Sequence, residues 1–286
     1  MPGLPKLKTH QVLAFAILAL ALEGCATTHD SLVRSTLRSP VKIVVMESPM
    51  DIDPERLEKV LVPDSKHDAP NLKDLIMEGR AHAEEYAMTS MEASLASERG
   101  FEIVKPSPKA ELAFANIQKA GLTTPLTQEQ ADLLHDDLGA DAILRFGVTD
   151  YGLTPRAWHD GYITFEVVST LAIAGIIASS ASTVSKAAAG TYLAEETVEE
   201  ATEAYAGFWA LDTDSRPVRI EEQLIQLKPL SAVWSDSDTG LAHSKLSRLY
   251  RKVPDAEKHQ QLDQATDEAT KTLAESLSAA LTRSSI

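Results

Sequence analysis

The chain has 286 residues, a formal net charge of −15 at pH 7, and 44% hydrophobic residues. This length and aliphatic content suffice for one large domain or two small ones with a real core, so the chain is not intrinsically disordered. The strong negative charge argues against nucleic acid and anionic lipid head groups as partners, because both need a positive surface. The single cysteine, Cys25, excludes an internal disulfide, and if it is acylated no thiol remains to ligate a metal.

The amino terminus has the pattern of a secretory signal peptide over residues 1–24. Lys6 and Lys8 precede the unbroken apolar run Val12–Leu22. That run is too short to cross a bilayer as a stable helix, but it fits the hydrophobic region of a secretion signal. The alternatives are cleavage without lipid attachment and an anchor that is not cleaved.

The signal ends in Leu22-Glu23-Gly24-Cys25-Ala26, which resembles the bacterial lipobox. The resemblance implies cleavage after the small residue Gly24, followed by attachment of diacylglycerol and an acyl chain such as palmitate to Cys25. Glu23 departs from the pattern, because that position usually carries a small or neutral residue. Ala26 stands where an aspartate would retain a lipoprotein of enteric bacteria in the inner membrane. By that resemblance the expected address is the outer membrane, with the protein facing the periplasm.

Residues 25–40 combine the lipidated cysteine with a Ser/Thr-rich stretch, which predicts a flexible tether. β-branched residues then predict a first strand over 41–46, followed by a polar, proline-containing loop to Pro70. Apolar residues at helical spacing predict a long helix over 72–95, with Asn71 as its N-cap.

The next segments alternate between strand and helix patterns. A second strand is expected over 101–104, and a short helix over 106–120. Thr127 and Gln130 form a capping box that starts another helix, and Gly139 ends it. A strand follows at once, with apolar residues alternating at Ala142, Leu144, Phe146 and Val148.

The carboxyl-terminal part predicts a β-hairpin of residues 217–227 and 231–235, followed by an amphipathic helix that begins at Asp255. The element order is β-α-β-α-α-β, an insertion, β-β and α. Alternating strands and helices favour parallel neighbours, and the hairpin adds antiparallel strands. The sequence therefore predicts an α/β fold with a mixed sheet of about five strands. The expected periplasmic domain comprises residues 41–150 plus 217–286.

The insertion, residues 151–216, is expected to form a helical hairpin. No charged residue occurs from 167 to 185, but only residues 171–178 are continuously apolar, which is marginal for spanning a membrane. Small residues let helix backbones approach closely. We expect close packing within the protein or at a protomer interface, with membrane contact by residues 161–190 as the alternative; the interface candidates are Gly175, Ala178 and Ser182.

Three segments resemble a superfamily of periplasmic lipoproteins: Leu138-Gly139-Ala140-Asp141-Ala142-Ile143-Leu144 after a helix, then Asp150-Tyr151-Gly152, then Val233-Trp234-Ser235 before a terminal helix. The superfamily includes the curli secretion-channel lipoprotein, the amino-terminal domain of the Tol translocation protein, and the lipoprotein activators of penicillin-binding proteins. The resemblance implies an α/β domain with a periplasmic interaction role and supplies no catalytic residue. The insertion departs from the compact members, so partner and assembly state do not transfer.

The remaining patterns predict no catalytic, cofactor or metal site. His135-Asp136-Asp137 is expected to be a solvated helix end, because adjacent helical residues point in different directions. Trp158-His159-Asp160 is expected in a polar loop, without the nucleophile that acid-base chemistry would serve. The acidic run Glu195–Glu203 lacks the alternating ligands and turn glycine of a calcium loop. Trp234 is expected to be a core anchor.

These observations favour a lipid-anchored, non-enzymatic binding or assembly protein of the cell envelope. Its partner would be the membrane, through the lipid, and an unknown envelope protein; a homo-oligomer is left open, and nucleic acid is not expected. One rival is an oligomeric secretion channel that inserts residues 161–190, although strand alternation is brief, at 162–167. The other is an envelope hydrolase, which the missing nucleophile disfavours.

Overall fold

The structure is a computed structural model that describes residues 37, 39–62, 70–107, 111–162, 164, 207–243 and 253–284. The chain forms two compact units, one of residues 28–155 with 211–286 and the other of residues 1–27 with 156–210. We call them the sheet unit and the inserted unit, and each is described by itself. In the described part of the chain, no helix is long and apolar enough to cross a membrane.

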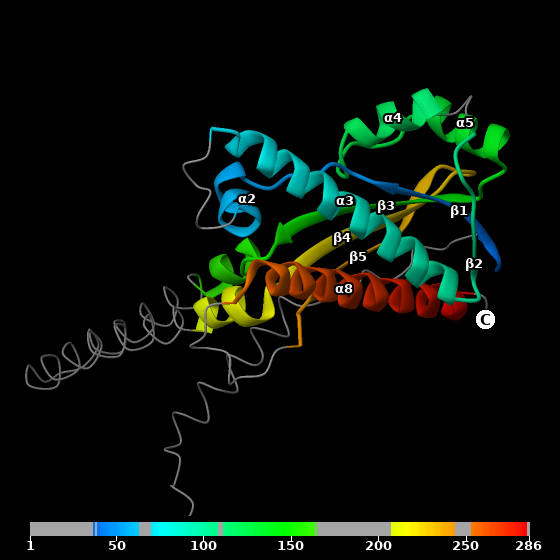
Figure 1. Ribbon diagram of the computed structural model, residues 1–286. Coiled ribbons are helices and arrows are strands. Elements are labelled where there is room, and N and C mark those ends of the chain that lie inside the picture. Colours follow the sequence, from blue (N-terminus) through cyan, green and yellow to red (C-terminus); the bar gives the residue numbers. More distant parts are fainter. Residues whose placement is uncertain are drawn as a thin grey trace, which may run out of the picture. The chain divides into compact units, whose positions relative to one another are not determined.

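Five strands of the described chain form one mixed sheet in the order β2-β1-β3-β4-β5 (Figure 1). Strand β1 (Val41–Glu47) lies parallel to β2 (Phe101–Ile103) and to β3 (Ala142–Tyr151). The hairpin of β4 (Val218–Gln226) and β5 (Ser231–Gly240) continues the sheet antiparallel. The predicted α/β class and mixed sheet are therefore confirmed, and β5 extends beyond its predicted end.

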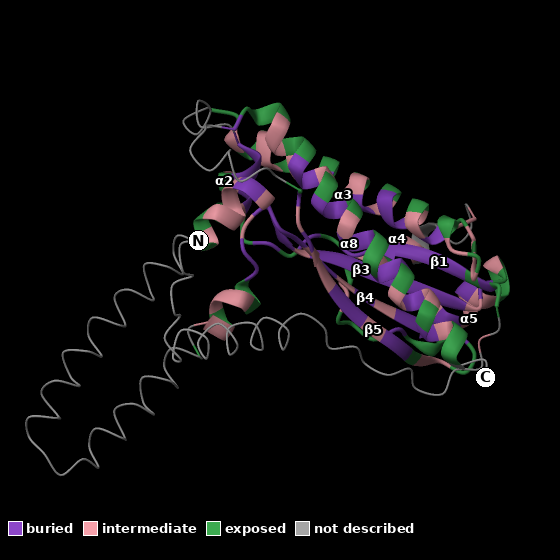
Figure 2. Cartoon of the chain, turned by 90° about the horizontal axis from the view of Figure 1, so that it is seen from below, coloured by how far each residue is buried: buried purple, intermediate pink, exposed green. Residues whose placement is uncertain are grey.

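One face of the sheet is covered by two long helices, α3 (Leu72–Ser97) and α8 (Asp255–Ser284), which lie side by side (Figure 1). The short helix α2 (Pro54–Leu61) packs into the same core. The predicted apolar stripe of β3 faces this layer, since all four of its residues belong to this core. Figure 2 shows that the strands are mostly buried, whereas each helix carries buried and exposed residues in turn.

The opposite face is covered by α4 (Glu111–Lys119) and α5 (Gln128–Leu138), which produce a second, smaller core (Figure 1). The sheet contributes to it from β1, β3 and β4, with Val44, Met46, Ile143 and Ile225. The sheet unit thus has three layers, and each side of the central sheet meets a different helical layer.

The structure confirms several predicted helix ends. Thr127 Oγ1 accepts from the amide of Gln130, whose side chain accepts from the Thr127 amide in return, so the capping box is formed. Gly139 ends α5 with φ of 65°, a left-handed conformation that favours glycine. Asp141 then accepts from the amide of Lys42 at 2.9 Å, which joins the start of β3 to β1.

Two details of the first helices differ from prediction. Residues expected in the loop after β1 form α2, because Asp53 caps the amide of Glu55 and Pro54 supplies the fixed φ of a first helical turn. Asn71 stands at the N-cap of α3 but makes no side-chain capping bond. The sequence pattern located the long helix correctly. Asn71 contributes to its first turn through its backbone carbonyl, which accepts from the amide of Leu75, and not through its side chain.

Helix α8 approaches β5 very closely at Gly240. A Cβ built on Gly240 would lie 1.9 Å from the carbonyl oxygen of Ala265 and 2.7 Å from the amide nitrogen of Ala269. Real side chains never approach so near, so only glycine allows α8 to rest on the strand. The small residues Ala265 and Ala269 are fully buried at this crossing.

The inserted unit is described only at its two ends. Residues 156–162 are helical, so the expectation that Trp158-His159-Asp160 forms a loop is wrong. The rings of His159 and Phe208 lie 4.2 Å apart between centroids, and Tyr162 meets Phe208 edge-on at 5.8 Å. An aromatic cluster, rather than a hydrogen-bonded loop, occupies this segment.

Candidate functional site

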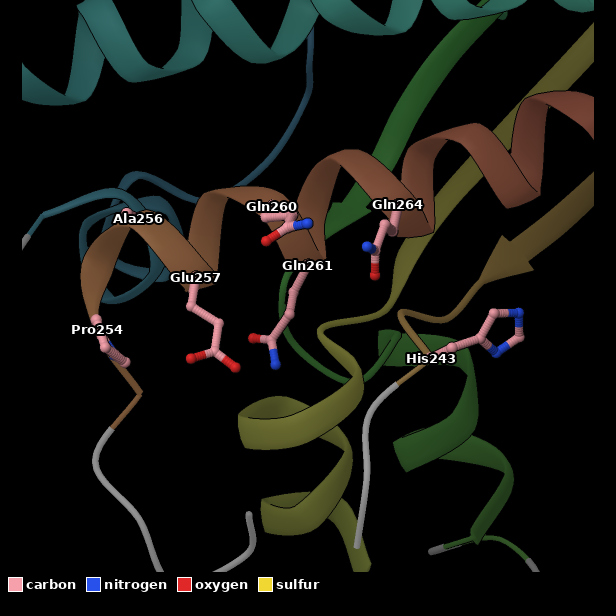
Figure 3. A pocket seen from close by; sticks show the side chains of 7 residues that line it. All are labelled: His243, Pro254, Ala256, Glu257, Gln260, Gln261 and Gln264. Atoms are coloured by element: carbon pink, nitrogen blue, oxygen red, sulfur yellow. The ribbon is translucent and has the colours of Figure 1, made fainter. Parts of the chain in front are cut away.

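A cavity of about 520 Å³ opens at the start of α8. We call it the α8 cavity; it is lined by His243, Pro254, Ala256, Glu257, Gln260, Gln261 and Gln264. Three of these residues, Glu257, Gln261 and Gln264, extend from the same side of the helix, because their spacing follows its 3.6-residue period (Figure 3). His243 stands after β5, at the exposed margin.

One amide of the lining is locked in orientation. Gln261 is only 4% exposed, and its Oε1 accepts from Arg216 Nε at 3.0 Å. Its Nε2 donates to the backbone carbonyl of Asp214 at 3.1 Å. Since arginine can only donate and a carbonyl can only accept, these partners determine which way the amide points. Gln260 and Gln264 are exposed, so their amides face solvent.

The wall behind Gln261 is the π-helical turn η2 (Leu211–Ser215), which leads into β4. Arg216 follows with φ of 38°, a left-handed backbone that costs of order 1–3 kcal/mol outside glycine. Burial lowers the pKa of Arg216, and the nearby carboxylates of Asp212, Asp255 and Asp214 oppose that shift. The strained backbone places a mostly buried guanidinium beside the cavity, where it orients Gln261.

The same end of the sheet is held together by polar contacts. Thr154 donates through its backbone amide and its hydroxyl to one carboxylate oxygen of Asp212. Arg56 donates to Asp150 at 3.3 Å and to the carbonyl of Thr154 at 3.0 Å. Gly152 has φ of 69°, and a Cβ there would lie 2.5 Å from Val60 and 2.9 Å from Leu262. The polar contacts join α2 and η2 to the chain that follows β3.

A second depression, of about 450 Å³, follows the outer seam between α3 and α8. Its floor is a hydrogen-bonded group in which Ser90 donates to Asp267 at 2.6 Å and contacts the hydroxyl of Thr270 at 2.8 Å. Tyr86 also donates to Asp267, and burial together with this carboxylate raises the pKa of Tyr86 to about 12. These side chains hydrogen-bond to one another across the two helices, so the contacts stabilise the packing of α3 against α8.

The structure does not describe most of the candidate residues that the sequence indicated. Gly24, Cys25, Gly175, Ala178 and Ser182 lie outside the described residues, as do the predicted signal peptide and helical hairpin. Among the described residues, no group of three or more His, Cys, Asp or Glu side chains could hold a metal ion.

The His135-Asp136-Asp137 segment is spread over different partners, as its helical spacing predicts. His135 Nδ1 contacts the carbonyl of Ala140 at 2.8 Å, so this histidine has a partner that the expected solvated helix end did not include. Lys228 donates to Asp136 at 2.7 Å, and that hydrogen bond lowers the pKa of Asp136. Trp234 is 5% exposed, which confirms its predicted core position.

Sequence pattern missed the α8 cavity. The run Gln260-Gln261 followed by Gln264 was visible, but glutamine is a common surface residue of helices, and the partners Asp214 and Arg216 are distant in sequence. The cavity arises because η2 returns against α8. No signal in the α8 segment alone could have indicated that return.

No protein-family model matches the chain, and no curated protein matches it. A solved PelC dodecamer from Paraburkholderia phytofirmans is similar over 88% of this chain and 96% of its own, with 11% identity and a TM-score of 0.34. Lipoprotein GNA1162 from Neisseria meningitidis covers 73% of this chain and 90% of its own, with 15% identity and a TM-score of 0.31.

The hypothetical protein CT253 from Chlamydia trachomatis is similar over 84% of this chain and 98% of its own, with 11% identity and a TM-score of 0.37. Similarities with TM-scores this low carry no conclusion about the function or assembly of this chain.

Proposed function

We propose that this chain is a lipid-anchored, non-enzymatic binding or assembly protein on the periplasmic face of the outer membrane. In this proposal the α8 cavity receives a segment of another envelope protein. The anchor is Cys25, and the sheet unit is the part that presents the cavity.

The lining of the α8 cavity is the observation that carries the proposal. Its exposed side chains include the amides of Gln260 and Gln264, each of which has donors and an acceptor but no proton to exchange near neutral pH. Such groups match the N–H and C=O groups of a polypeptide backbone. The chemistry that the lining supports is hydrogen bonding, which suits recognition.

The sequence supports the anchored location. Cys25 is the only cysteine and stands in a lipobox-like segment, so lipid attachment accounts for it. Two acyl attachments at one residue provide the strength that stable anchoring requires. The chain between Cys25 and Val41 can span at most roughly 50 Å, so an anchored sheet unit would remain near the membrane surface.

Site-specific cross-linking in intact cells tests the binding role. Gln260→Cys and Gln264→Cys each introduce a thiol at the cavity, and Glu275→Cys provides a matched control on the same exposed helix, outside the cavity lining. Because the lipid occupies Cys25, each introduced thiol is unique. We expect both cavity positions to capture the same envelope protein and the control to capture none. Equal capture at all three positions, or none at any, contradicts the proposal.

Replacement of the anchor tests the location separately. Cys25→Ala should leave an unprocessed or soluble precursor that lacks the mass of the lipid. Membrane fractionation on a density gradient and intact-mass measurement check both expectations. A variant that fractionates with the outer membrane at unchanged mass shows that Cys25 is not the anchor.

A further inference from the structure

Arg145 is a buried cation at the centre of the sheet. It lies in β3 on the α4/α5 side, between Met46 of β1 and Gln223 of β4 in the strand register. The residue is 1% exposed, although arginine is among the residues least often buried without a partner. Its Nη1 donates to the backbone carbonyl of Thr124 at 2.6 Å.

The other two nitrogens of this guanidinium are buried and have no hydrogen-bond partner. They are Nε and Nη2, whose N–H bonds run parallel along one edge of the planar group. This edge is the fork with which arginine binds two oxygens of a carboxylate or phosphate. The carbonyl of Thr124 therefore holds Arg145 by the remaining nitrogen and leaves the fork unused.

One further donor on this side of the sheet is also unused. The hydroxyl of Ser48, which directly follows β1, is buried without a partner. Gly147 of β3 lies next to it, and a Cβ placed there would meet only Ser48, at an ordinary 3.6 Å. Gly147 therefore places no side chain beside the hydroxyl of Ser48.

No described residue supplies a compensating negative charge to Arg145. Glu221 stands opposite Gly147 on β4, but it is 44% exposed and its carboxylate lies 3.4 Å from Nε of Arg219. Arg219 also donates to Ser237 at 2.7 Å, so this neighbouring arginine is satisfied by protein groups. A buried unpaired charge is costly, and arginine cannot discard its charge at neutral pH.

We propose that the Nε/Nη2 edge of Arg145 binds a small oxyanion, with the hydroxyl of Ser48 as a further donor, in the space that the missing side chain of Gly147 leaves on this face. The ligand is small because Arg145 is 1% exposed, which leaves no approach for a macromolecular anion. Phosphate, sulfate and carboxylate share the paired oxygens that fit the fork. This site is separate from the α8 cavity, so it does not depend on the proposed binding role.

Thermal unfolding of the full chain in detergent tests the proposal. Sodium phosphate, sulfate and acetate are each titrated at an ionic strength held constant with sodium chloride. A ligand that binds only the folded state raises Tm in proportion to the logarithm of its concentration above Kd. We expect a rise of several degrees, linear in the logarithm of concentration above Kd, with at least one oxyanion and none with chloride alone. A response to phosphate and sulfate indicates a tetrahedral ligand, and a response to acetate indicates a carboxylate.

Matched variants separate binding from a general salt effect. Arg145→Met should abolish the rise, Arg145→Lys should weaken the apparent affinity at least tenfold because the fork is lost, and Arg219→Met should retain it. Without oxyanion, Arg145→Met should also melt at a higher temperature than the wild type, because an uncompensated charge is removed. If Arg145→Met does not fold, Gly147→Val fills this space while retaining Arg145, and it should abolish the rise. No rise with any oxyanion, or an equal rise in these variants, overturns the proposal.

Discussion

The two faces of the sheet bury ionisable groups of opposite kind, acids on one face and a base on the other. Under α3 and α8 the sheet buries carboxyl groups, with Glu47, Glu222 and Asp236 at 5%, 2% and 7% exposure. Under α4 and α5 it buries Arg145. The comparison shows that a buried acid and a buried base do not pose the same physical problem.

The acids form one row across the strands. The register aligns Glu47 with Phe146, Phe146 with Glu222, and Glu222 with Asp236. Burial raises the pKa of Glu47 to about 9, assisted by the negative charge of Glu84. Burial also raises the pKa of Glu222 well above its ordinary value, and Asp236 adds to the shift. At neutral pH Glu47 is therefore protonated and neutral, and the shift at Glu222 favours its neutral form in the same way.

Arg145 cannot become neutral by changing its protonation state at neutral pH. Burial lowers its pKa as well, but an arginine begins so far above neutral pH that it remains charged. Glu47 and Glu222 avoid the cost of burying a charge by binding protons. Arg145 stays charged, so it needs a counter-anion to offset that cost. This difference is why only the α4/α5 face calls for a ligand.

The largest expected effect on stability comes from a glycine that lies against the α8 backbone. Gly240→Ala forces a methyl group into the α8 backbone, and we expect a loss of roughly 3 kcal/mol or more in the free energy of unfolding. Gly147→Ala, on the other face, meets only an ordinary contact and should cost less than about 1 kcal/mol. Chemical denaturation of both variants measures the contrast. Equal destabilisation by the two substitutions would contradict the close contact between Gly240 and the α8 backbone.

The protonated acids predict a pH dependence of stability. A carboxyl group whose pKa is raised by folding stabilises most below its unfolded pKa, near 4.5, and this stability is lost as pH rises toward about 9. Glu47→Gln removes the dependence, so the variant should gain on the wild type by about 2–3 kcal/mol between pH 6 and pH 8.

Denaturant unfolding at those two pH values measures the effect, with Glu222→Gln as a second variant in the same direction. The exposed substitution Glu275→Gln is the control and should leave the slope of stability against pH as in the wild type. A Glu47→Gln variant that follows the wild-type slope contradicts protonation in the folded state.

Hydrogen bonding between α3 and α8 gives a smaller effect. Ser90 is 8% exposed and contacts Asp267 and Thr270, so Ser90→Ala should cost about 1–2 kcal/mol. The neighbouring exposed Thr89 bonds only within its own helix, and Thr89→Ala should be nearly neutral. Urea unfolding of the two alanine variants compares them. A loss no larger for Ser90 than for Thr89 would rule out the interhelical contribution.

The smallest expected effect concerns the opposite face. Thr127→Ala removes the N-cap of α5, which should cost about 1 kcal/mol. Thr127→Ser retains the hydroxyl and should recover most of it. Hydrogen exchange of α5 amides provides a local measurement, and protection that is unchanged in Thr127→Ala would show that the cap does not hold this helix.

Local patterns in the sequence predicted most of the sheet unit. The capping box at Thr127, the helix end at Gly139 and the alternating stripe of β3 act through neighbours in the chain, so they were readable without a structure. Helix α2 was missed because its proline and charged residues resemble a loop, although Asp53-Pro54 is a capping signal.

Residue pattern by itself determined the α/β class, the order of the strands and of the helices other than α2, and the candidate lipid anchor at Cys25, because periodicity, caps and a lipobox-like segment are local. Tertiary structure decided which polar groups meet. Gln261 has its hydrogen-bond partners only because Arg216 and Asp214 lie against α8, and Arg145 is buried only because α4, α5 and the loop between them cover the sheet. Which side chains are buried and which hydrogen-bond partners they meet depend on residues far apart in the chain, so no local sequence pattern predicts them.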